Sequence, residues 1–445
     1  MSVQTPAATI TSLPNELLAV IAAAGQGRSR VPGLLPDPTA EWTLSHVSHR
    51  FRRVMIGSPA LWTLIEADLH SEGSVEILGL YLERSQNYSL AVTLQHRSEL
   101  REDSERELAT KRLNQLVPHI NRISWLRIAV QEWGGDLLLA PFRDLAAPIL
   151  QHLEVVNLID YYHWDPIALF SAGAPRIQFL KVYDQKIQLP ASQWTSTLTH
   201  LELRRYHRLA DLFDGNKSFD KVLAYCPSLI YLYLDMEWAS LDHQVQIPSL
   251  QTLHITISES HELMKIIDIF DAPSLTELTI MGVHGFELFE LFNSTSLPRA
   301  SFPALASLCF VKNNNSTCYC ERNIPPPPRA PFTPFQLFPA LSSLSLINIC
   351  FTSRIVEGVV IPTSAMCPIL QTIALSPRTA AMEAVRSAVL DAMCSYLRYG
   401  RSLPTLRLSP ALACSEDWQK HGIAVEKFDP TSILQVFLAS KLKYA

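Results

Sequence analysis

The sequence predicts an α/β protein: a three-helix N-terminal module followed by an irregular repeat solenoid, with a curved parallel sheet and helices on its outer side. Three observations lead to this prediction. A short phrase rich in leucine recurs between residues 148 and 375. Within the phrase, aliphatic and other residues alternate with the period of a strand that is buried on one face. About 15 to 25 residues separate the copies, enough for a helix or an irregular connector.

The phrase is proline, any residue, leucine, two free positions, leucine, one free position and an aliphatic residue. Copies begin at Pro148, Pro175, Pro227, Pro248, Pro273, Pro303, Pro339 and Pro368, and a further copy without proline begins at Leu198. Looser copies begin at Ile123 and Leu403. Chance would supply about one copy in a chain of this composition, so the repetition decides the predicted architecture. Such arrays present an extended surface to other molecules.

Composition limits the functional classes. The 445 residues are 48% hydrophobic and 18% charged, with a net charge of −5, as in a folded globular protein. The charge is not gathered into the basic stripe that a nucleic-acid binder needs. We expect no membrane span, because no apolar run approaches the required length of about 18 residues. Eight cysteines without a recognisable secretory signal favour reduced thiols in the cytoplasm or the nucleus.

The chain divides into five expected regions. Residues 1–10 form a polar tail, 11–70 a helical module, 71–118 a connecting segment, 119–410 the repeats, and 411–445 a C-terminal cap. A proline-rich insert at 312–336 is expected to be an exposed loop, and a docking motif for a proline-binding module remains an alternative there.

Local patterns predict the elements outside the repeats. Thr11 or Ser12 can cap a first helix whose first turn contains Pro14. A second helical stretch runs through residues 42–54 and ends at Gly57. Further expected elements are helices at 74–84, 99–117 and 431–443, and strands at 90–94 and 423–428.

With both ends described, the chain resembles an F-box protein with C-terminal leucine-rich repeats. The matching residues are Leu13-Pro14, residues 47–51 (Val-Ser-His-Arg-Phe) and residues 58–62 (Ser-Pro-Ala-Leu-Trp), together with a Cys-Pro that opens the repeats at Pro227 and Pro368. Ser48 and Phe51 depart from the family, which usually has Cys and Trp there. The loop between the first two helices is also about a dozen residues longer than usual, and surface loops lengthen at little cost.

The resemblance implies a receptor without catalytic residues, metal or cofactor. The box would bind the Skp-type adaptor of a cullin–RING ubiquitin ligase, and the repeats would hold an unknown protein substrate near the conjugating enzyme. Candidate adaptor-binding residues are Leu13, Pro14, Leu17, Leu18, Ile21, Val47, Phe51, Leu61 and Trp62. Some of them must serve the core of the module. We expect Leu13, Pro14 and Trp62 to be exposed anchors.

Strand alternation selects the candidate substrate-binding residues. Where leucines face the core, the residues between them face the other side of the sheet, as expected of His152, Glu154 and Val156 in the copy at Pro148. The aromatic and charged part of this set consists of Phe179, Lys181, Tyr183, Glu202, Arg204, Tyr231, Tyr233 and Asp235. The equivalent residues of later repeats are mostly small and include few aromatic or charged side chains. The alternative is that the selected residues are only solvated strand positions.

Two further interpretations stay open. The chain could be a repeat scaffold outside any ligase, whose box no longer engages the adaptor. It could instead be an enzyme that uses His163 and Asp165 in a connector, although the familiar catalytic motifs are absent from the sequence. Cys309, Cys318 and Cys320 suggest a metal clip only weakly, because no histidine pair accompanies them.

Overall fold

The computed structural model of the chain divides into two compact units. The first unit contains residues 1–178 and 185–194, and the second contains residues 179–184 and 195–445. The structure describes residues 10, 13–26, 40–69, 74–96, 103–130, 138–157, 167–184, 187–188, 195–204, 223, 226–236, 244–257, 263–283, 287–288, 291, 302–312, 338–349, 369–377, 382–398, 403–415 and 417–431.

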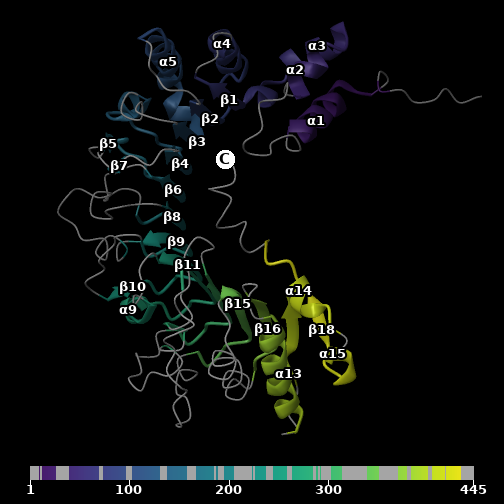
Figure 1. Cartoon of the computed structure of the whole chain (residues 1–445). Helices are drawn as coiled ribbons and strands as arrows, with labels where there is room; N and C mark the ends of the chain where they lie inside the picture. Colours follow the sequence, from purple (N-terminus) through teal and green to yellow (C-terminus); the bar gives the residue numbers. More distant parts are fainter. Residues whose placement is uncertain are drawn as a thin grey trace, which may run out of the picture. The chain divides into compact units, whose positions relative to one another are not determined.

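The first unit begins with a cluster of short helices (Figure 1). These are α1 (Asn15–Gln26), α2 (Ala40–Ser45), α3 (His49–Ile56) and the 3-10 helix η2 (Pro59–Trp62). The expectation of one helical stretch across residues 42–54 is wrong. The chain leaves helical geometry at Ser48, whose hydroxyl accepts a hydrogen bond from the Phe51 N–H at 3.3 Å and so caps α3.

The rest of the first unit is sheet and helix. The further elements are β1 (Leu64–Asp68), α4 (Ser74–Arg84), β2 (Leu90–His96), α5 (Asp103–Leu116), η3 (Val117–Arg122), β3 (Ile123–Val130), η4 (Ala140–Phe142), β4 (His152–Asn157), β5 (Ile167–Ala168) and β7 (Ile187–Gln188). The helix expected at 74–84 and the strand expected at 90–94 are confirmed. The helix expected at 99–117 is confirmed from Asp103 onward.

The second unit contains most of the repeat strands. They are β6 (Phe179–Tyr183), β8 (His200–Arg204), β9 (Tyr231–Met236), β11 (Thr252–Ile257), β13 (Glu277–Met281), β14 (Ser307–Val311), β15 (Ser343–Ile349), β16 (Thr372–Pro377), β17 (Thr405–Leu408) and β18 (Val425–Lys427). The remaining elements are the paired short strands β10 (Val245–Gln246) and β12 (Phe270–Asp271) and the helices α9 (Leu263–Ile269), α13 (Met382–Arg398), α14 (Pro410–Ala413) and α15 (Asp417–Lys420).

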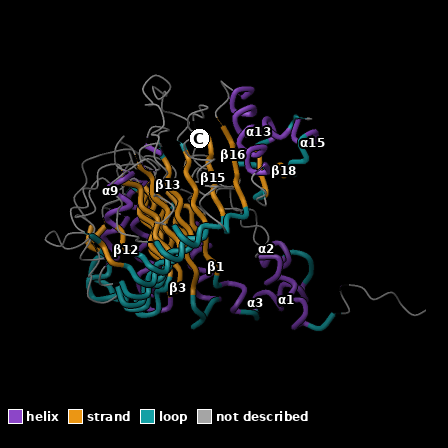
Figure 2. The backbone as a smooth tube through the Cα atoms, turned by 90° about the horizontal axis from the view of Figure 1, so that it is seen from below, coloured by secondary structure: helices purple, strands orange, loops and turns teal. Residues whose placement is uncertain are grey.

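Fourteen strands of the described residues form one parallel sheet, which confirms the α/β class and the parallel strands of the repeats. In the first unit the order is β1-β2-β3-β4, and in the second it is β6-β8-β9-β11-β13-β14-β15-β16-β17-β18. Figure 2 shows β13, β15 and β16 as parts of one layer of strands. The looser phrases at Ile123 and Leu403 also form strands, namely β3 and β17.

The recurring proline occupies one place in a turn that precedes strands β4, β6, β9, β11, β13, β14 and β15. In Ile247-Pro248-Ser249-Leu250, for example, the Leu250 N–H donates to the Ile247 carbonyl at 3.2 Å. The equivalent bond closes the turns at Leu150, Ile177, Leu229, Leu275, Leu305 and Leu341. Proline suits the second position of such a turn because its φ is fixed near the required value. Each of these prolines is exposed, whereas the residue before it and the leucine or isoleucine that closes the turn are buried.

Neighbouring repeats of the second unit share a backbone pattern at the start of their strands. The Ile230 carbonyl accepts from both Gln251 N–H and Thr252 N–H, at 2.9 and 3.0 Å. The Thr199, Gln251, Thr276, Ala306 and Ser342 carbonyls accept in the same paired way. Because this pattern fixes the register, the core leucines of adjacent strands lie side by side, as Leu232, Leu253 and Leu278 do. The residues between them lie on the opposite face of the sheet, which we call the polar face.

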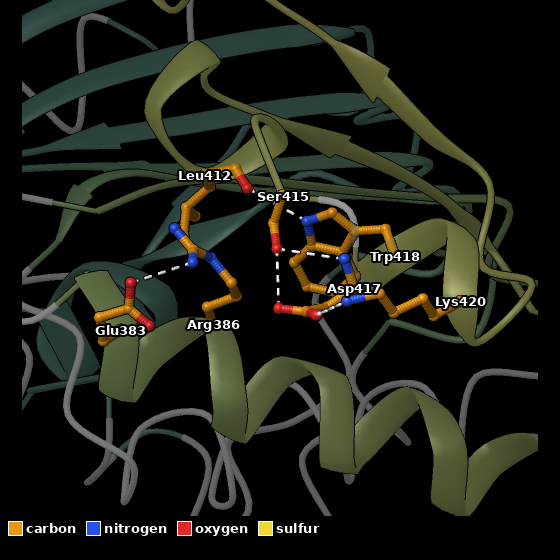
Figure 3. Close-up of polar contacts among 7 residues, drawn as sticks. All are labelled: Glu383, Arg386, Leu412, Ser415, Asp417, Trp418 and Lys420. Atoms are coloured by element: carbon orange, nitrogen blue, oxygen red, sulfur yellow. Dashed lines mark hydrogen bonds and ion pairs between the residues drawn. The ribbon is translucent and has the colours of Figure 1, made fainter.

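The C-terminal part of the second unit is held by short polar contacts (Figure 3). The Trp418 indole N–H donates to the Leu412 carbonyl at 3.1 Å, and the Asp417 carboxylate accepts from Ser415 at 2.9 Å and from Lys420 at 3.3 Å. On α13, Arg386 and Glu383 form an ion pair at 3.1 Å. The strand expected at 423–428 is confirmed as β18. The helix expected at 431–443 lies almost wholly outside the described residues.

None of the helices in the described part of the chain combines the length and apolar character needed to cross a membrane.

Candidate functional site

Trp62 belongs to the core of the three-helix module rather than to its surface. Its indole N–H donates to the Met55 carbonyl at 2.8 Å. The Tyr81 ring packs edge-on at 4.9 Å between centroids, and the Arg84 guanidinium lies 4.3 Å from the centroid of the indole ring. The Trp62 side chain is fully buried. The prediction that Trp62 is an exposed anchor is therefore wrong, because Tyr81 and Arg84 of α4 complete the core that the module alone would leave open.

Three more of the predicted adaptor-binding residues are also core residues. Leu18, Phe51 and Leu61 are each at most 2% exposed. Phenylalanine at position 51 thus fills the interior of the module, where a large apolar ring contributes most to stability.

A buried carboxylate joins the module to the following helix. Glu41 accepts a hydrogen bond from the Gln26 amide at 2.7 Å and another from the Tyr81 hydroxyl at 2.7 Å. The Gln26 amide also donates to the Leu61 carbonyl at 2.6 Å. These bonds link α1, α2, η2 and α4, so the three helices and α4 share one interior. No sequence pattern indicates this network, since its members are far apart along the chain.

The other predicted adaptor-binding residues lie at the surface of the first unit. Leu17 and Ile21 of α1 are 47% and 45% exposed, and Val47 ahead of α3 is 60% exposed. Pro14 is exposed and Leu13 is half-buried. The same surface exposes Val20 on α1, at 61%, which the sequence reasoning had not selected. Spacings of three and four residues place Leu17, Val20 and Ile21 on one side of α1. We call these three residues the α1 stripe.

The second candidate surface is the part of the polar face made by β6, β8, β9 and β11 in the second unit. Register pairs Phe179 with His200 and His200 with Tyr231, and it pairs Lys181 with Glu202 and Glu202 with Tyr233. Strand alternation thus predicted correctly which residues share a face.

Aromatic rings stack from strand to strand on this surface. The centroids of Phe179 and His200 lie 5.9 Å apart, and those of His200 and Tyr231 lie 5.7 Å apart, with nearly parallel planes in both pairs. His254 continues the row at 5.3 Å from Tyr231 and 6.2 Å from Tyr233. We call Phe179, His200, Tyr231 and His254 the ring row. All four rings of the row are half-buried, so part of each ring is open to a ligand.

A charged cluster lies beside the ring row. Glu202 accepts from Arg204 at 3.2 Å and lies 3.5 Å from the Lys181 ammonium group. The Arg204 guanidinium also covers the Tyr233 ring at 4.1 Å from its centroid, and the Tyr233 hydroxyl bonds with the Thr256 hydroxyl at 3.1 Å. One carboxylate is thus shared by two cations. Lys181 is the more exposed of the two and offers donors to a partner.

Burial sets the protonation of the aromatic groups. It lowers the pKa of His254 to about 4; the Glu202 charge opposes this shift and the Arg204 charge adds to it. Burial also raises the pKa of Tyr233 to about 12 and raises the pKa of Tyr231. At neutral pH His254 is uncharged and both phenols keep their protons, so this surface offers neutral rings and hydroxyl groups beside the charged cluster.

Several of the candidate substrate-binding residues are less accessible to solvent than strand alternation alone predicted. Tyr183, Arg204 and Tyr233 are buried, and Asp235 is half-buried. The interpretation of Tyr183, Arg204 and Tyr233 as merely solvated strand residues is therefore wrong. On the later strands, Met281, Cys309, Val311 and Ile347 form a buried cluster with Tyr233. The surface that is open to a partner is thus concentrated on the ring row and Lys181.

The first unit has a related arrangement that was only half predicted. Trp125 and His152 stack at 5.0 Å between centroids on β3 and β4. Glu154 lies 2.9 Å from His152 and 3.3 Å from Arg127. Alternation had selected His152 and Glu154 but not Trp125 and Arg127. The same rule applied to the looser phrase at Ile123 would have found them.

The chemical alternatives raised by the sequence receive no support from the described residues. Among them, no group of His, Cys, Asp and Glu side chains could hold a metal ion. Cys309 is buried, and burial raises the pKa of its thiol to about 12. The structure does not describe Cys318 and Cys320, the connector residues His163 and Asp165, or the proline-rich insert beyond Lys312, which is itself buried.

Comparison with known proteins adds little. No protein-family model and no curated protein matches the chain. Among solved structures, the crystal structure of a Bacteroides fragilis protein determined by a structural genomics consortium matches 78% of this chain and 67% of that chain. The two sequences are 11% identical and the TM-score is 0.27, which is too low to carry an argument about fold or function.

Proposed function

We propose that this chain is the substrate-recognition subunit of an SCF-type cullin–RING E3 ubiquitin ligase. The N-terminal three-helix module would bind the Skp-type adaptor, and the polar face of the repeat strands would bind the substrate protein. The chain would then contribute no catalytic group. It would act by raising the concentration of substrate near the conjugating enzyme, in the cytoplasm or the nucleus.

The observation that carries the proposal is the α1 stripe at the surface of a helical module that precedes a repeat sheet. Leu17, Val20 and Ile21 leave apolar surface uncovered in the isolated chain. Exposed apolar groups that cluster on one side of a helix are typical of a protein-binding site. The Leu-Pro at Leu13-Pro14 and the Ser-Pro-x-Leu-Trp ending at Trp62 support the assignment of this module to the F-box family.

The composition of the second surface supports the substrate-binding role. The ring row and the Lys181, Glu202 and Arg204 cluster combine aromatic groups with paired charges, as the centres of specific protein interfaces do. They stand on parallel strands of one sheet, so a partner meets side chains at fixed positions. A rigid platform reduces the ordering cost of binding.

Co-purification with the Skp-type adaptor tests the proposal. We expect the full chain to form a complex with the adaptor, and we expect a double substitution of Leu17→Asp and Ile21→Asp to abolish it. Ile369→Asp is the matched control, because Ile369 in a repeat turn is as exposed as Leu17, at 47%. This control should leave the complex intact, since it places the same charge on an equally exposed apolar site elsewhere.

The outcome separates the ligase subunit from a repeat scaffold. If the wild-type chain forms no complex with the adaptor, the ligase assignment is wrong, and a protein-binding scaffold is the function that remains. If the complex forms but the α1 double variant binds as well as the wild type, the α1 stripe is not the adaptor-binding surface.

A further inference from the structure

Helix α3, which contacts the start of α1 through Arg50, exposes a dense group of cations. Arg50, Arg52 and Arg53 occur within four residues, and the helix contains no acidic residue. All three side chains are exposed. The exposed apolar residues Val47 and Ile56 flank them at the two ends of the helix, with Ile56 at 41% exposed.

A specific contact sets α3 against α1. The Arg50 guanidinium donates to the Asn15 side chain at 3.0 and 3.1 Å and to the Leu13 carbonyl. Arg50 therefore serves the interior of the module by fixing the start of α1. Arg52 and Arg53 do not form this contact with the start of α1.

Among the described residues, no carboxylate neutralises Arg52 or Arg53. The Arg52 guanidinium donates to the backbone carbonyl of Ser45 at 3.1 Å. No carboxylate of the described residues lies within ion-pair distance of Arg52 or Arg53. Glu16 on α1 is exposed, whereas Glu41 on α2 is buried and bonded to Gln26 and Tyr81. The described residues of the module therefore expose more positive than negative charge, although the whole chain has a net charge of −5.

From this arrangement we infer that the partner of the three-helix module presents an acidic border around an apolar centre, and that Arg52 and Arg53 steer its approach. The inference rests on the proposed function and adds the chemistry of the adaptor surface that fits. The α1 stripe supplies the apolar contact, which governs how long the complex lasts. The two guanidinium groups attract carboxylates over about the Debye length and so govern how fast it forms.

The net negative charge of the chain makes steering by Arg52 and Arg53 more selective for orientation. An acidic partner is repelled by the chain as a whole at long range, and a local positive patch makes one orientation of approach favourable. The patch therefore selects the correct face of the module as well as the partner. Arginine suits this task because its planar guanidinium can bond a carboxylate through two N–H groups.

The experiment measures association and dissociation rates of the full chain with purified Skp-type adaptor across a salt series. The series spans Debye lengths from about 30 Å to about 3 Å. For the wild type we expect the association rate to fall steeply with salt. For Arg52→Glu with Arg53→Glu we expect the association rate at low salt to fall by about tenfold or more, with little salt dependence left. Arg52→Gln with Arg53→Gln, which removes the charges without reversing them, should lie between the two.

The matched control changes the same charges elsewhere in the first unit. Arg143 and Arg176 are exposed residues outside the helical module, and Arg143→Glu with Arg176→Glu should reproduce the wild-type rates. Thermal unfolding of each variant shows whether the module is intact, and the glutamine pair provides the answer if the glutamate pair fails to fold.

A flat salt dependence of the wild-type association rate, or a glutamate pair that associates as fast as the wild type, overturns the inference and leaves the proposed function standing. Absence of adaptor binding at every salt concentration overturns both together.

Discussion

Glu202 holds two cations on the polar face, and its removal tests how strongly that surface is organised. The side chains of Glu202 and Arg204 are 12% and 7% exposed. Glu202→Gln replaces the carboxylate that accepts from the nearly buried Arg204 guanidinium with a neutral amide. We expect it to lower the free energy of unfolding by about 1 to 3 kcal/mol, because a charge-assisted hydrogen bond in a nearly buried place is lost. Urea unfolding followed by circular dichroism measures the change.

The control for this prediction is Glu383→Gln on α13. Glu383 is also paired with an arginine, but its side chain is 88% exposed, so water replaces the lost partner. We expect a change within about 0.5 kcal/mol. Equal losses at the two positions would show that the Glu202 cluster is only a surface ion pair.

His254 makes the stability of the second unit depend on pH in a defined window. Its pKa is lowered from 6.5 to about 4 by burial, so the unfolded chain takes up the proton first as the pH falls. The contribution of His254 is therefore complete above pH 6.5, is lost progressively toward pH 4, and amounts to at most about 3 kcal/mol. His254→Gln should flatten the slope of unfolding free energy against pH in this range.

The stacked contacts of His254 are also lost in that variant, so its absolute stability at pH 7 is not informative and the slope is the measured quantity. His49→Gln provides the comparison, because His49 on α3 is exposed. A slope for His254→Gln that equals the slope for His49→Gln would contradict the assignment of the lowered pKa to His254.

At the scale of single elements, the end of β13 requires a glycine. Gly282 has a φ of +89°, and a Cβ atom built there would lie 1.9 Å from the Ile257 carbonyl oxygen. Its N–H donates to the Val311 carbonyl at 2.8 Å, so the backbone has little freedom to move away. We expect Gly282→Ala to destabilise the protein by more than about 2 kcal/mol, since both strain and a backbone clash oppose it.

Gly79 in α4 provides the opposite case for the same substitution. No atom lies within 4 Å of a Cβ built at Gly79. Gly79→Ala should raise the unfolding free energy by about 0.5 to 1 kcal/mol, because alanine restricts the unfolded chain and favours a helix. Thermal unfolding of both variants checks the pair, and a Gly282→Ala protein as stable as the wild type would refute the prediction for β13.

The elements that the sequence predicted well are those set by local chemistry. The proline that precedes most of the repeat strands fixes a turn, and the alternation after it fixes which side of the strand is buried. These strands and their faces therefore followed from neighbouring residues. The break at Ser48 was also local, and a serine three residues before Phe51 is a capping signal that the single-helix prediction overlooked.

The parts of the candidate sites that the sequence did not reveal depend on distant partners. Trp62 is buried by Tyr81 and Arg84, and Tyr233 is buried beside residues of strands β13 to β15. Alternation assigns a residue to a face but contains no information about what covers that face. The depth of burial, and the pKa shifts that follow from it, therefore required the three-dimensional arrangement.

At the scale of the whole molecule, the sheet limits how far a local defect spreads. Each repeat strand pairs only with its immediate neighbours in the described sheet, as β15 does with β14 and β16. Stability in such an array is approximately a sum of repeat terms and nearest-neighbour terms. A defect in one repeat should therefore loosen that repeat and its neighbours before it reaches the rest of the chain.

Leu344→Ala in β15 tests this limit. Leu344 is fully buried, so the substitution should cost about 2 to 5 kcal/mol through lost burial and the cavity that it leaves. Hydrogen exchange followed by mass spectrometry should show faster exchange in β14, β15 and β16, with β2, β3 and β4 unchanged. Leu126→Ala in β3, equally buried in the first unit, should give the reverse pattern. Equal acceleration in both units for either variant would show one cooperative structure and remove the nearest-neighbour account.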